Sequence, residues 1–217
     1  MEKDRTITVK GVGSLNLKSD YIKIAIYLDE KNTDYQQGYA DFAKHIKELQ
    51  DSIIKAGFNK TDLRTSSIDI KADYDTVKKN DSYVRVLLGY QYFTKMIIRF
   101  DIDSEKFNYL LSKVYESGIN AELKIEYTIR NKETAKNELL SRASKDAKIK
   151  ANALCEGLGV KLGKLLSIVY NLQDDDFTST YKKYGLAKSI TIETDVDITP
   201  NDIYVEDGAC FIWEITD

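Results

Sequence analysis

Few side chains in this sequence are of the kinds that carry out covalent catalysis or bind transition metals. His45 is the only histidine, and the two cysteines are Cys155 and Cys210. A nucleophilic serine or cysteine that relied on a histidine base would have to use His45. His45 stands between Phe42 and Ile46 on a predicted helix, which favours a partly exposed structural histidine. One histidine without a cysteine cluster also matches no transition-metal motif.

Both cysteines are predicted to be buried free thiols. Two cysteines are too few for a disulfide framework in a chain of 217 residues. Redox sensing through the thiol of Cys155 is an alternative that stays open.

Two short motifs resemble ligand sites but lack the required spacing. Gly11-Val12-Gly13 begins like a dinucleotide fingerprint, yet Asn16 replaces the third glycine and a strand follows instead of a helix. We predict a tight turn at these glycines. Asp174–Asp176 offer oxygen atoms to calcium, but the glycine and the terminal glutamate of an EF-hand loop are missing. We predict a solvated acidic loop there.

Basic residues recur along the longest predicted helix, and acidic partners accompany them. Glu138 with Arg142, and Asp146 with Lys150, have the i,i+4 spacing of a solvated helix face. An anion-binding surface is the alternative, but aromatic residues suited to single-stranded nucleic acid are missing there. The net charge of −3 also argues against a nucleic-acid partner. The basic residues are Lys132, Lys136, Arg142, Lys145, Lys148 and Lys150.

The composition is that of a folded, soluble protein. Hydrophobic residues make up 42% and charged residues 31% of the chain, and the fifteen tyrosines favour sheet surfaces or interfaces. No apolar stretch reaches the roughly 18 residues of a membrane span. The start of the sequence has no apolar signal region, so we expect a cytoplasmic protein as numbered. A periplasmic or cell-envelope location is the alternative if a leader was removed.

Hydrophobic periodicity predicts three helices. The longest runs for about 25 residues from Glu133 to a glycine cap at Gly159. A second begins near Thr33, contains Gly38 at a close approach to the sheet, and ends at Gly57. A short one begins at Asp103 or Ser104 and ends at Gly118. The predicted apolar stripe of the longest helix is Leu140, Ala143, Ala147, Ala151, Leu154 and Leu158.

Alternating apolar residues predict the strands. The longest pattern, Val84–Ile102, is too long for one flat strand, so we expect a bend or bulge near Gly89, or a first half that projects as a hairpin arm. The apolar run Leu165–Tyr170 is predicted to be a buried strand. The other predicted strands are Thr6–Val9, Tyr21–Leu28, Ser66–Tyr74, Leu123–Ile129, Ser189–Val196 and Cys210–Ile215.

The order of these elements predicts an α+β fold. Residues Tyr21–Arg130 follow the order β-α-β-β-α-β of a ferredoxin-like core, in which two helices cover one face of an antiparallel sheet. The long third helix and additional N- and C-terminal strands extend this core. We find no linker, so residues 1–217 are predicted to be one domain, with its core at about 21–130 and the extension at about 131–217.

Four segments together resemble the SIMPL-domain (DUF541) family. Residues 6–24 resemble its glycine-containing first strand, and residues 56–70 place Asp62 and Thr65 in its D-x-x-T positions. Gly89-Tyr90 is similar to the pair that begins a later family strand. Residues 147–168 are similar to its most recognisable block, an alanine-rich helix that leads into L-G-x-x-L-G. Pro200-Asn201 departs from the family's usual Pro-Gly.

The resemblance implies a function as well as a fold. The family includes bacterial periplasmic or outer-membrane-associated proteins linked to oxidative-stress defence and a eukaryotic adaptor of kinase signalling, has no established catalytic residues, and tends to self-associate. We therefore expect a non-enzymatic protein that acts by self-assembly or by binding a protein partner, with no catalytic, metal or cofactor site and no nucleic-acid partner. The alternative is a small-ligand-binding protein or an undetected enzyme, with a pocket between the sheet and the added strands.

Overall fold

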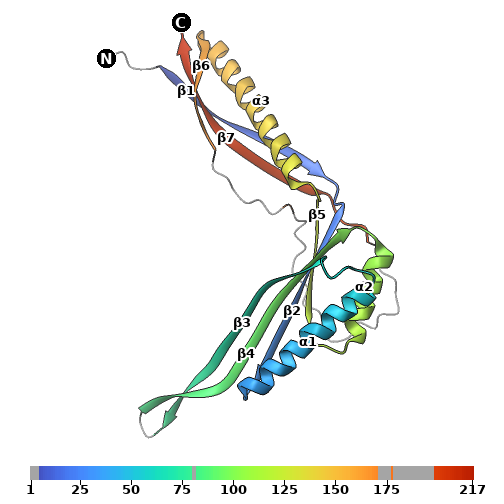
Figure 1. The fold of residues 1–217 in the computed structure, drawn as a ribbon. Coiled ribbons are helices and arrows are strands. Elements are labelled where there is room, and N and C mark those ends of the chain that lie inside the picture. Colours follow the sequence, from blue (N-terminus) through green and yellow to red (C-terminus); the bar gives the residue numbers. More distant parts are fainter. Residues whose placement is uncertain (1–4, 80–81, 171–176, 178–197) are drawn as a thin grey trace. The chain divides into compact units, whose positions relative to one another are not determined.

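The computed structural model describes residues 5–79, 82–170, 177 and 198–217 (Figure 1). These residues form two antiparallel sheets and three helices, which confirms the α+β class. The helices are α1 (Tyr35–Lys55), α2 (Ser104–Glu116) and α3 (Lys132–Leu158). The strands are β1 (Thr6–Leu17), β2 (Tyr21–Asn32), β3 (Leu63–Lys79), β4 (Ser82–Asp101), β5 (Glu122–Thr128), β6 (Lys161–Val169) and β7 (Ile203–Thr216).

The chain divides into two compact units. We call the part that spans Tyr21–Tyr127 the central unit, and the part built from β1, α3, β6 and β7 the α3 unit. Two of the sequence-based predictions, the acidic loop Asp174–Asp176 and the strand Ser189–Val196, lie outside the described residues. The assignment of the whole chain to one domain stays a prediction.

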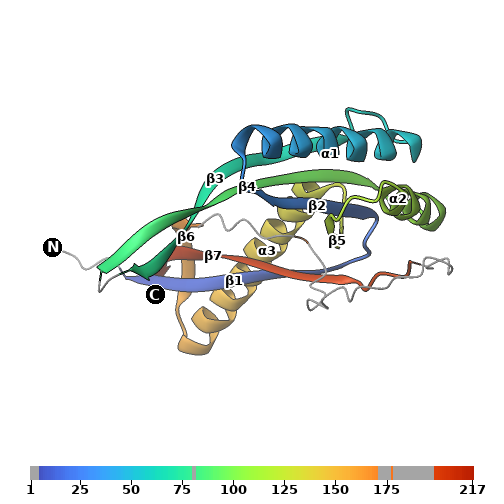
Figure 2. The same cartoon turned by 90° about the horizontal axis from the view of Figure 1, so that it is seen from below.

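The central unit has the predicted ferredoxin-like topology. Its sheet has the strand order β3-β4-β2-β5, which is the second, third, first and fourth strand of the unit along the chain. α1 and α2 pack on one face of this sheet (Figure 2). The alternate residues of β2 and β4 that face the helices form the core, and Ile24, Ile26 and Met96 are completely buried there.

Short polar side chains set the starts of the two central helices. The Asp34 side chain accepts a hydrogen bond from the backbone N–H of Gln37, so α1 begins at Asp34 and not at Thr33 as predicted. Asp103 caps α2 in the same way, as predicted, by accepting from the N–H of Lys106. Asp34 replaces Thr33 because its carboxylate is the stronger acceptor for the orphan N–H groups of the first turn.

A close approach between α1 and the sheet occurs at Gly38, as predicted. A Cβ atom at Gly38 would lie 2.6 Å from the ring of Tyr92. Tyr92 is completely buried, and its hydroxyl donates a hydrogen bond of 2.8 Å to the carbonyl oxygen of Tyr35. The glycine therefore makes room for an aromatic ring that also satisfies a backbone carbonyl of the first helical turn.

The α3 unit is a second sheet covered by one long helix. The strand order is β1-β7-β6, so the N-terminal strand and the last two strands form their own sheet and do not lengthen the ferredoxin-like sheet. α3 ends as predicted at Gly159, which has a left-handed φ of 69°. The N–H groups of Gly159 and Val160 bond back to the carbonyls of Glu156 and Cys155, the paired bonds of a Schellman cap.

The predicted apolar stripe of α3 was only partly right. The three alanines at its centre are completely buried, but Leu154 and Leu158 are 49% and 73% exposed. The buried row advances in steps of four residues, and such a row winds slowly around a helix, so it follows the twist of the sheet beneath. The buried residues are Ala135, Leu139, Ala143, Ala147, Ala151 and Cys155.

The predicted tight turn at Gly11-Val12-Gly13 is wrong, because β1 runs through these residues without interruption. A Cβ atom at Gly11 would lie 2.0 Å from the carbonyl oxygen of Ala143, and one at Gly13 would lie 2.1 Å from that of Leu139. The glycines therefore let the backbones of β1 and α3 approach closely. They serve packing and not a change of chain direction.

The prediction that Leu165–Tyr170 is a buried strand is also wrong. β6 forms, but it lies at the edge of its sheet, and Leu165, Leu166, Ile168 and Val169 are 47–54% exposed. An uninterrupted apolar run indicates a strand without telling on which side it is covered.

The contact between β1 and α3 predicts a large effect of one added methyl group. We expect Gly11→Ala to lower the free energy of unfolding by roughly 1–3 kcal/mol or more, because the new Cβ overlaps a helix carbonyl that cannot move freely. Urea denaturation followed by circular dichroism measures the change.

Gly157→Ala is the matched control for this substitution. Gly157 lies within α3, and a Cβ atom there would meet nothing within 4 Å. Alanine should leave stability unchanged or raise it by up to about 1 kcal/mol. Equal urea midpoints for wild type and Gly11→Ala would contradict the close approach.

Candidate functional site

The ends of β3 and β4 extend beyond the rest of the central sheet as a two-stranded arm (Figure 1). We define the arm as residues 74–79 and 82–88. The pairing of β4 with β2 stops at Tyr90 opposite Asn32, so within the sheet the arm strands pair only with each other. Both alternatives raised by the long Val84–Ile102 pattern are thus realised. A bulge separates the arm from the sheet at Gly89, whose φ is 148°.

Large apolar side chains are exposed on both faces of the arm. Tyr74 and Leu87 are cross-strand neighbours on one face, and Val77 and Val84 are neighbours on the other. The guanidinium of Arg85 stacks over the ring of Tyr74 at 4.1 Å. Exposed by 41–75% are Tyr74, Val77, Tyr83, Val84, Val86, Leu87 and Leu88.

The arm by itself buries too little to be stable. An isolated two-stranded hairpin is marginal in water, and contiguous exposed apolar groups mark surfaces that contact other molecules. The arm is therefore the strongest candidate for a functional surface among the described residues.

One edge of the sheet in the α3 unit is closed by side chains of α3. The backbone N–H of Val12 donates a hydrogen bond of 2.8 Å to Oδ2 of Asp146, which also forms an ion pair with Lys150. Arg142 donates to the carbonyl oxygen of Ser14 at 2.9 Å. The predicted i,i+4 pairs Glu138–Arg142 and Asp146–Lys150 are confirmed. Their contacts with β1 were not predicted, because they join residues far apart in the sequence.

The remaining sheet edges differ in how open they are. β5 is a short edge strand of 7 residues, and β6 pairs with β7 through two register irregularities that interrupt its edge. β3 is 17 residues long and is the outer strand of its sheet. Its pairing with β4 also has two irregularities, but they lie on either side of the uninterrupted stretch Ser67–Asp73. Long regular edges invite pairing with another chain, whereas short or bulged edges resist it. The β3 edge is thus the most available backbone surface in the described residues.

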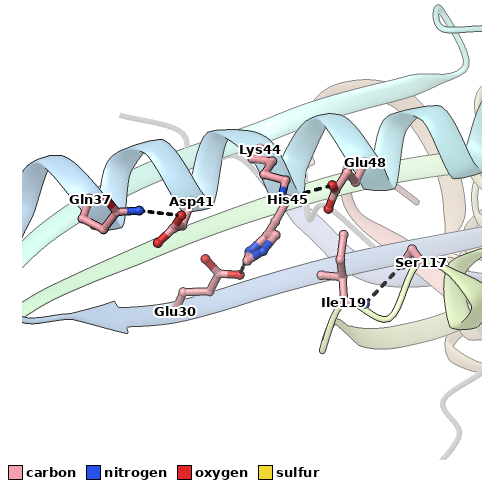
Figure 3. Close-up of polar contacts among 8 residues, drawn as sticks. All are labelled: Glu30, Gln37, Asp41, Lys44, His45, Glu48, Ser117 and Ile119. Atoms are coloured by element: carbon pink, nitrogen blue, oxygen red, sulfur yellow. Dashed lines mark hydrogen bonds and ion pairs between the residues drawn. The ribbon is translucent and has the colours of Figure 1, made fainter.

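His45 is a partly exposed residue of the α1 surface, as predicted. Its Nδ1 atom lies 2.6 Å from Oε1 of Glu30, and the two side chains are 35% and 24% exposed (Figure 3). Beside this pair, Gln37 donates a hydrogen bond to Asp41 along the same helix. An imidazole held by a carboxylate has the orientation of a general base. Among the described residues, no serine or cysteine side chain forms a hydrogen bond with the His45 ring.

A half-buried ion cluster lies on the face of the central sheet opposite the helices. Glu126 pairs with Lys23 at 2.6 Å and with Lys124. Burial raises the pKa of the Glu126 carboxyl, but the hydrogen bonds from Lys124 and Lys23 outweigh burial, so the pKa is lowered overall. The two lysines therefore keep the Glu126 carboxyl ionised at neutral pH, so this carboxyl does not act as a proton donor there.

The two thiols have different environments. Cys155 lies on the buried face of α3 and is 3% exposed, as predicted. Cys210 was also predicted to be buried, but it is only half-buried. Cys210 lines a hollow of about 390 Å³ together with Lys10, Glu206 and Asp207. The carboxylate of Asp207 accepts a hydrogen bond from Tyr170, so the hollow is polar and already internally bonded.

No cluster of three or more histidine, cysteine or acidic side chains that could hold a metal ion occurs among the described residues. No described helix is long and apolar enough to cross a membrane.

The edge contact of Asp146 predicts a pH-dependent contribution to stability. The hydrogen bonds from Lys150 and from the Val12 N–H lower the pKa of Asp146 below its ordinary value. A lowered pKa stabilises the folded state above the unfolded pKa, and this contribution is lost as the pH falls through the folded pKa. We expect Asp146→Asn to lower the free energy of unfolding by about 1 kcal/mol at neutral pH, which urea denaturation measures.

The same comparison at acidic pH tests the sign of this effect. Below about pH 4 the difference between wild type and Asp146→Asn should shrink, because the wild-type carboxyl becomes protonated. Glu138→Gln is the control, since Glu138 contacts only the exposed Arg142 and should matter less. A difference that grows toward acidic pH would refute the assignment.

The exposures of the thiols predict which one reacts. In the native protein a chromogenic disulfide reagent should titrate Cys210 first, and Cys155 should react roughly tenfold or more slowly, because it requires opening of the helix. Cys210→Ser should abolish the fast phase. Rapid labelling of Cys155 in that variant would revive the idea of redox sensing at this position.

Comparison with known proteins gives one finding. The family model described as SIMPL, a protein of unknown function (DUF541), matches residues 7–206, while no curated protein matches the chain. The matched range contains both of the β1 glycines, all of α3 and its Gly159 cap. These features hold α3 against the sheet of the α3 unit. The chain therefore belongs to the SIMPL (DUF541) family.

Proposed function

We propose that this chain acts by contacts between proteins, first of all with further copies of itself, through the arm and the adjoining edge of β3. The observation that carries the proposal is the exposed apolar surface of the arm, which packs on none of the hydrophobic cores formed by the described residues. Complete burial of a valine or leucine side chain contributes roughly 1.5–3 kcal/mol, so covering several of these side chains favours association.

The polar surroundings support contact more than catalysis. The His45 imidazole is already held by Glu30, and the carboxylate of Glu126 is neutralised by two lysines. The hollow beside Cys210 is polar, whereas ligand pockets are usually lined mainly by apolar groups. Two hollows that are more apolar, beside Ile53 and beside Gly89, measure only about 200 and 240 Å³, below the usual size of ligand pockets. A small-ligand or enzymatic function stays a prediction, and so does the cytoplasmic location.

The wider role has its only support in the family resemblance. Some members of the family take part in oxidative-stress defence and lie in the bacterial cell envelope. We propose for this chain that any such role runs through assembly or a bound protein partner. The arm would then be the contact surface in either case.

Assembly is measured by size-exclusion chromatography with light scattering. We expect the full chain to be oligomeric at tens of micromolar and to dissociate on dilution, because the apolar area of one arm supports a contact of modest affinity. A chain that is strictly monomeric over this range would contradict self-assembly.

A shortened arm serves as the decisive variant. Asp73 and Gly89 lie directly opposite each other, so an Asn-Gly turn can join them in place of residues 74–88. We expect this variant to assemble more weakly, because the apolar arm is gone while the β3 edge before it remains. Its thermal midpoint should stay unchanged, because the removed side chains are exposed. Unaltered assembly would show that the arm is not the contact surface.

A further inference from the structure

The middle of β3 is a regular stretch of edge on which no described strand pairs. The pairing of β3 with β4 is uninterrupted from Ser67 to Asp73, between one irregularity before Ser67 and another after Asp73. Within this stretch Ile68 is 59% exposed although it is a β-branched apolar residue. Ile70, at the centre of the stretch, is only partly buried. A flat edge of this kind presents unpaired backbone N–H and carbonyl groups to another strand.

Two charged side chains on this stretch, Asp69 and Lys71, form no ion pair among the residues that the structure describes. Across the β3–β4 pair, Asp69 faces Phe93 and Lys71 faces Gln91. Asp69 and Lys71 precede and follow Ile70 in the strand. Their side chains lie on the face of the sheet opposite the helices, whereas Ile70 faces the helices.

We infer that the β3 edges of two copies pair antiparallel about a two-fold axis at Ile70, which joins two central sheets into one. This inference rests on the proposed self-assembly and names its interface. The pairing sets Asp69 opposite Lys71 of the second copy, and symmetry repeats this ion pair on the other side of the axis. Ile70 meets its own copy, and Ile68 meets Ala72.

Charge complementarity selects this register over its neighbours. A two-fold axis perpendicular to the sheet sets residues of the same face opposite each other, so the axis must pass through one residue. An axis at Asp69 or at Lys71 would oppose like charges at the centre. An axis at Ala72 would set Asp69 against Asp75, and its Lys71–Asp73 pair would compete with the ion pair that Asp73 already forms with Lys31. An axis at Ile68 would set both charges opposite the uncharged Ser67 and Thr65. Opposite charges across a strand pair are favourable, and like charges are unfavourable.

Pairing along this edge also explains how the arm is supported. β-augmentation supplies backbone hydrogen bonds to an edge strand, and alternate side chains determine specificity. The new strand would lie beside the base of the arm, where β3 otherwise has β4 as its single neighbour. A three-strand base is more stable than a two-strand ribbon.

Charge reversal with rescue tests the proposal in the full chain. Asp69→Lys and Lys71→Asp should each weaken the dimer roughly 10- to 50-fold, because two attractive pairs become repulsive. The double variant D69K/K71D should return to within about threefold of wild type, since the pairs are restored with reversed polarity. Light scattering over a dilution series measures the dissociation constant.

Glu156→Lys is the matched control for Asp69→Lys, because it makes the same change in net charge at an exposed position of α3 and should leave association unaltered. If wild type associates but the single variants do so equally well, or the double variant is not rescued, the Ile70-centred interface is overturned while self-assembly stands. A monomeric wild type overturns both.

Cysteine cross-linking reads the register directly. In a Cys210→Ser background, an equal mixture of Asp69→Cys and Lys71→Cys chains should form a disulfide-linked dimer on mild oxidation, because these positions face each other. Either variant alone should give at least about fivefold less, since its like cysteines are diagonal neighbours roughly 7–8 Å apart. Equal yields in the mixture and in each single variant, or no cross-link at all, would overturn this register.

Discussion

The unpaired backbone at the edge of a sheet is the constraint on which the rest of this structure depends. Each edge strand presents N–H and carbonyl groups that need partners, and the two sheets of this chain meet that need differently. β1 is closed by the side chains of Asp146 and Arg142, β5 is short, and β6 is irregular. β3 is a long outer strand with no such protection among the described residues. It is therefore the edge at which we expect another chain to pair.

Closing the β1 edge requires α3 to lie unusually close to the sheet. Two glycines on the strand and a row of alanines on the helix remove the side chains that would hold the backbones apart. The closeness brings Asp146 within hydrogen-bond distance of a strand N–H. The small residues thus allow the close packing that positions Asp146. The hydrogen bond of Asp146 in turn occupies a backbone N–H group of β1 that another strand could otherwise use.

Sequence periodicity was most informative where one face of an element meets a continuous core. The helix ends at Gly57, Gly118 and Gly159, the cap at Asp103 and the bend at Gly89 were all predicted, because each depends on a local backbone requirement. The order β-α-β-β-α-β followed from the same local signals. The prediction that Leu165–Tyr170 is a buried strand failed, because burial of these apolar side chains depends on which distant segments pack against them.

By itself the sequence determined the elements, the α+β class and the family pattern, since these depend on contacts between residues close along the chain. It also showed how few residues are equipped for catalysis. Only the tertiary structure decided that the N- and C-terminal strands form a separate sheet and that Gly11 and Gly13 let a helix approach closely. It also decided that β3 is an outer strand, with no described strand paired to its free edge. Strand neighbours are chosen by pairing between distant segments, and no local periodicity encodes which edge is left without a partner.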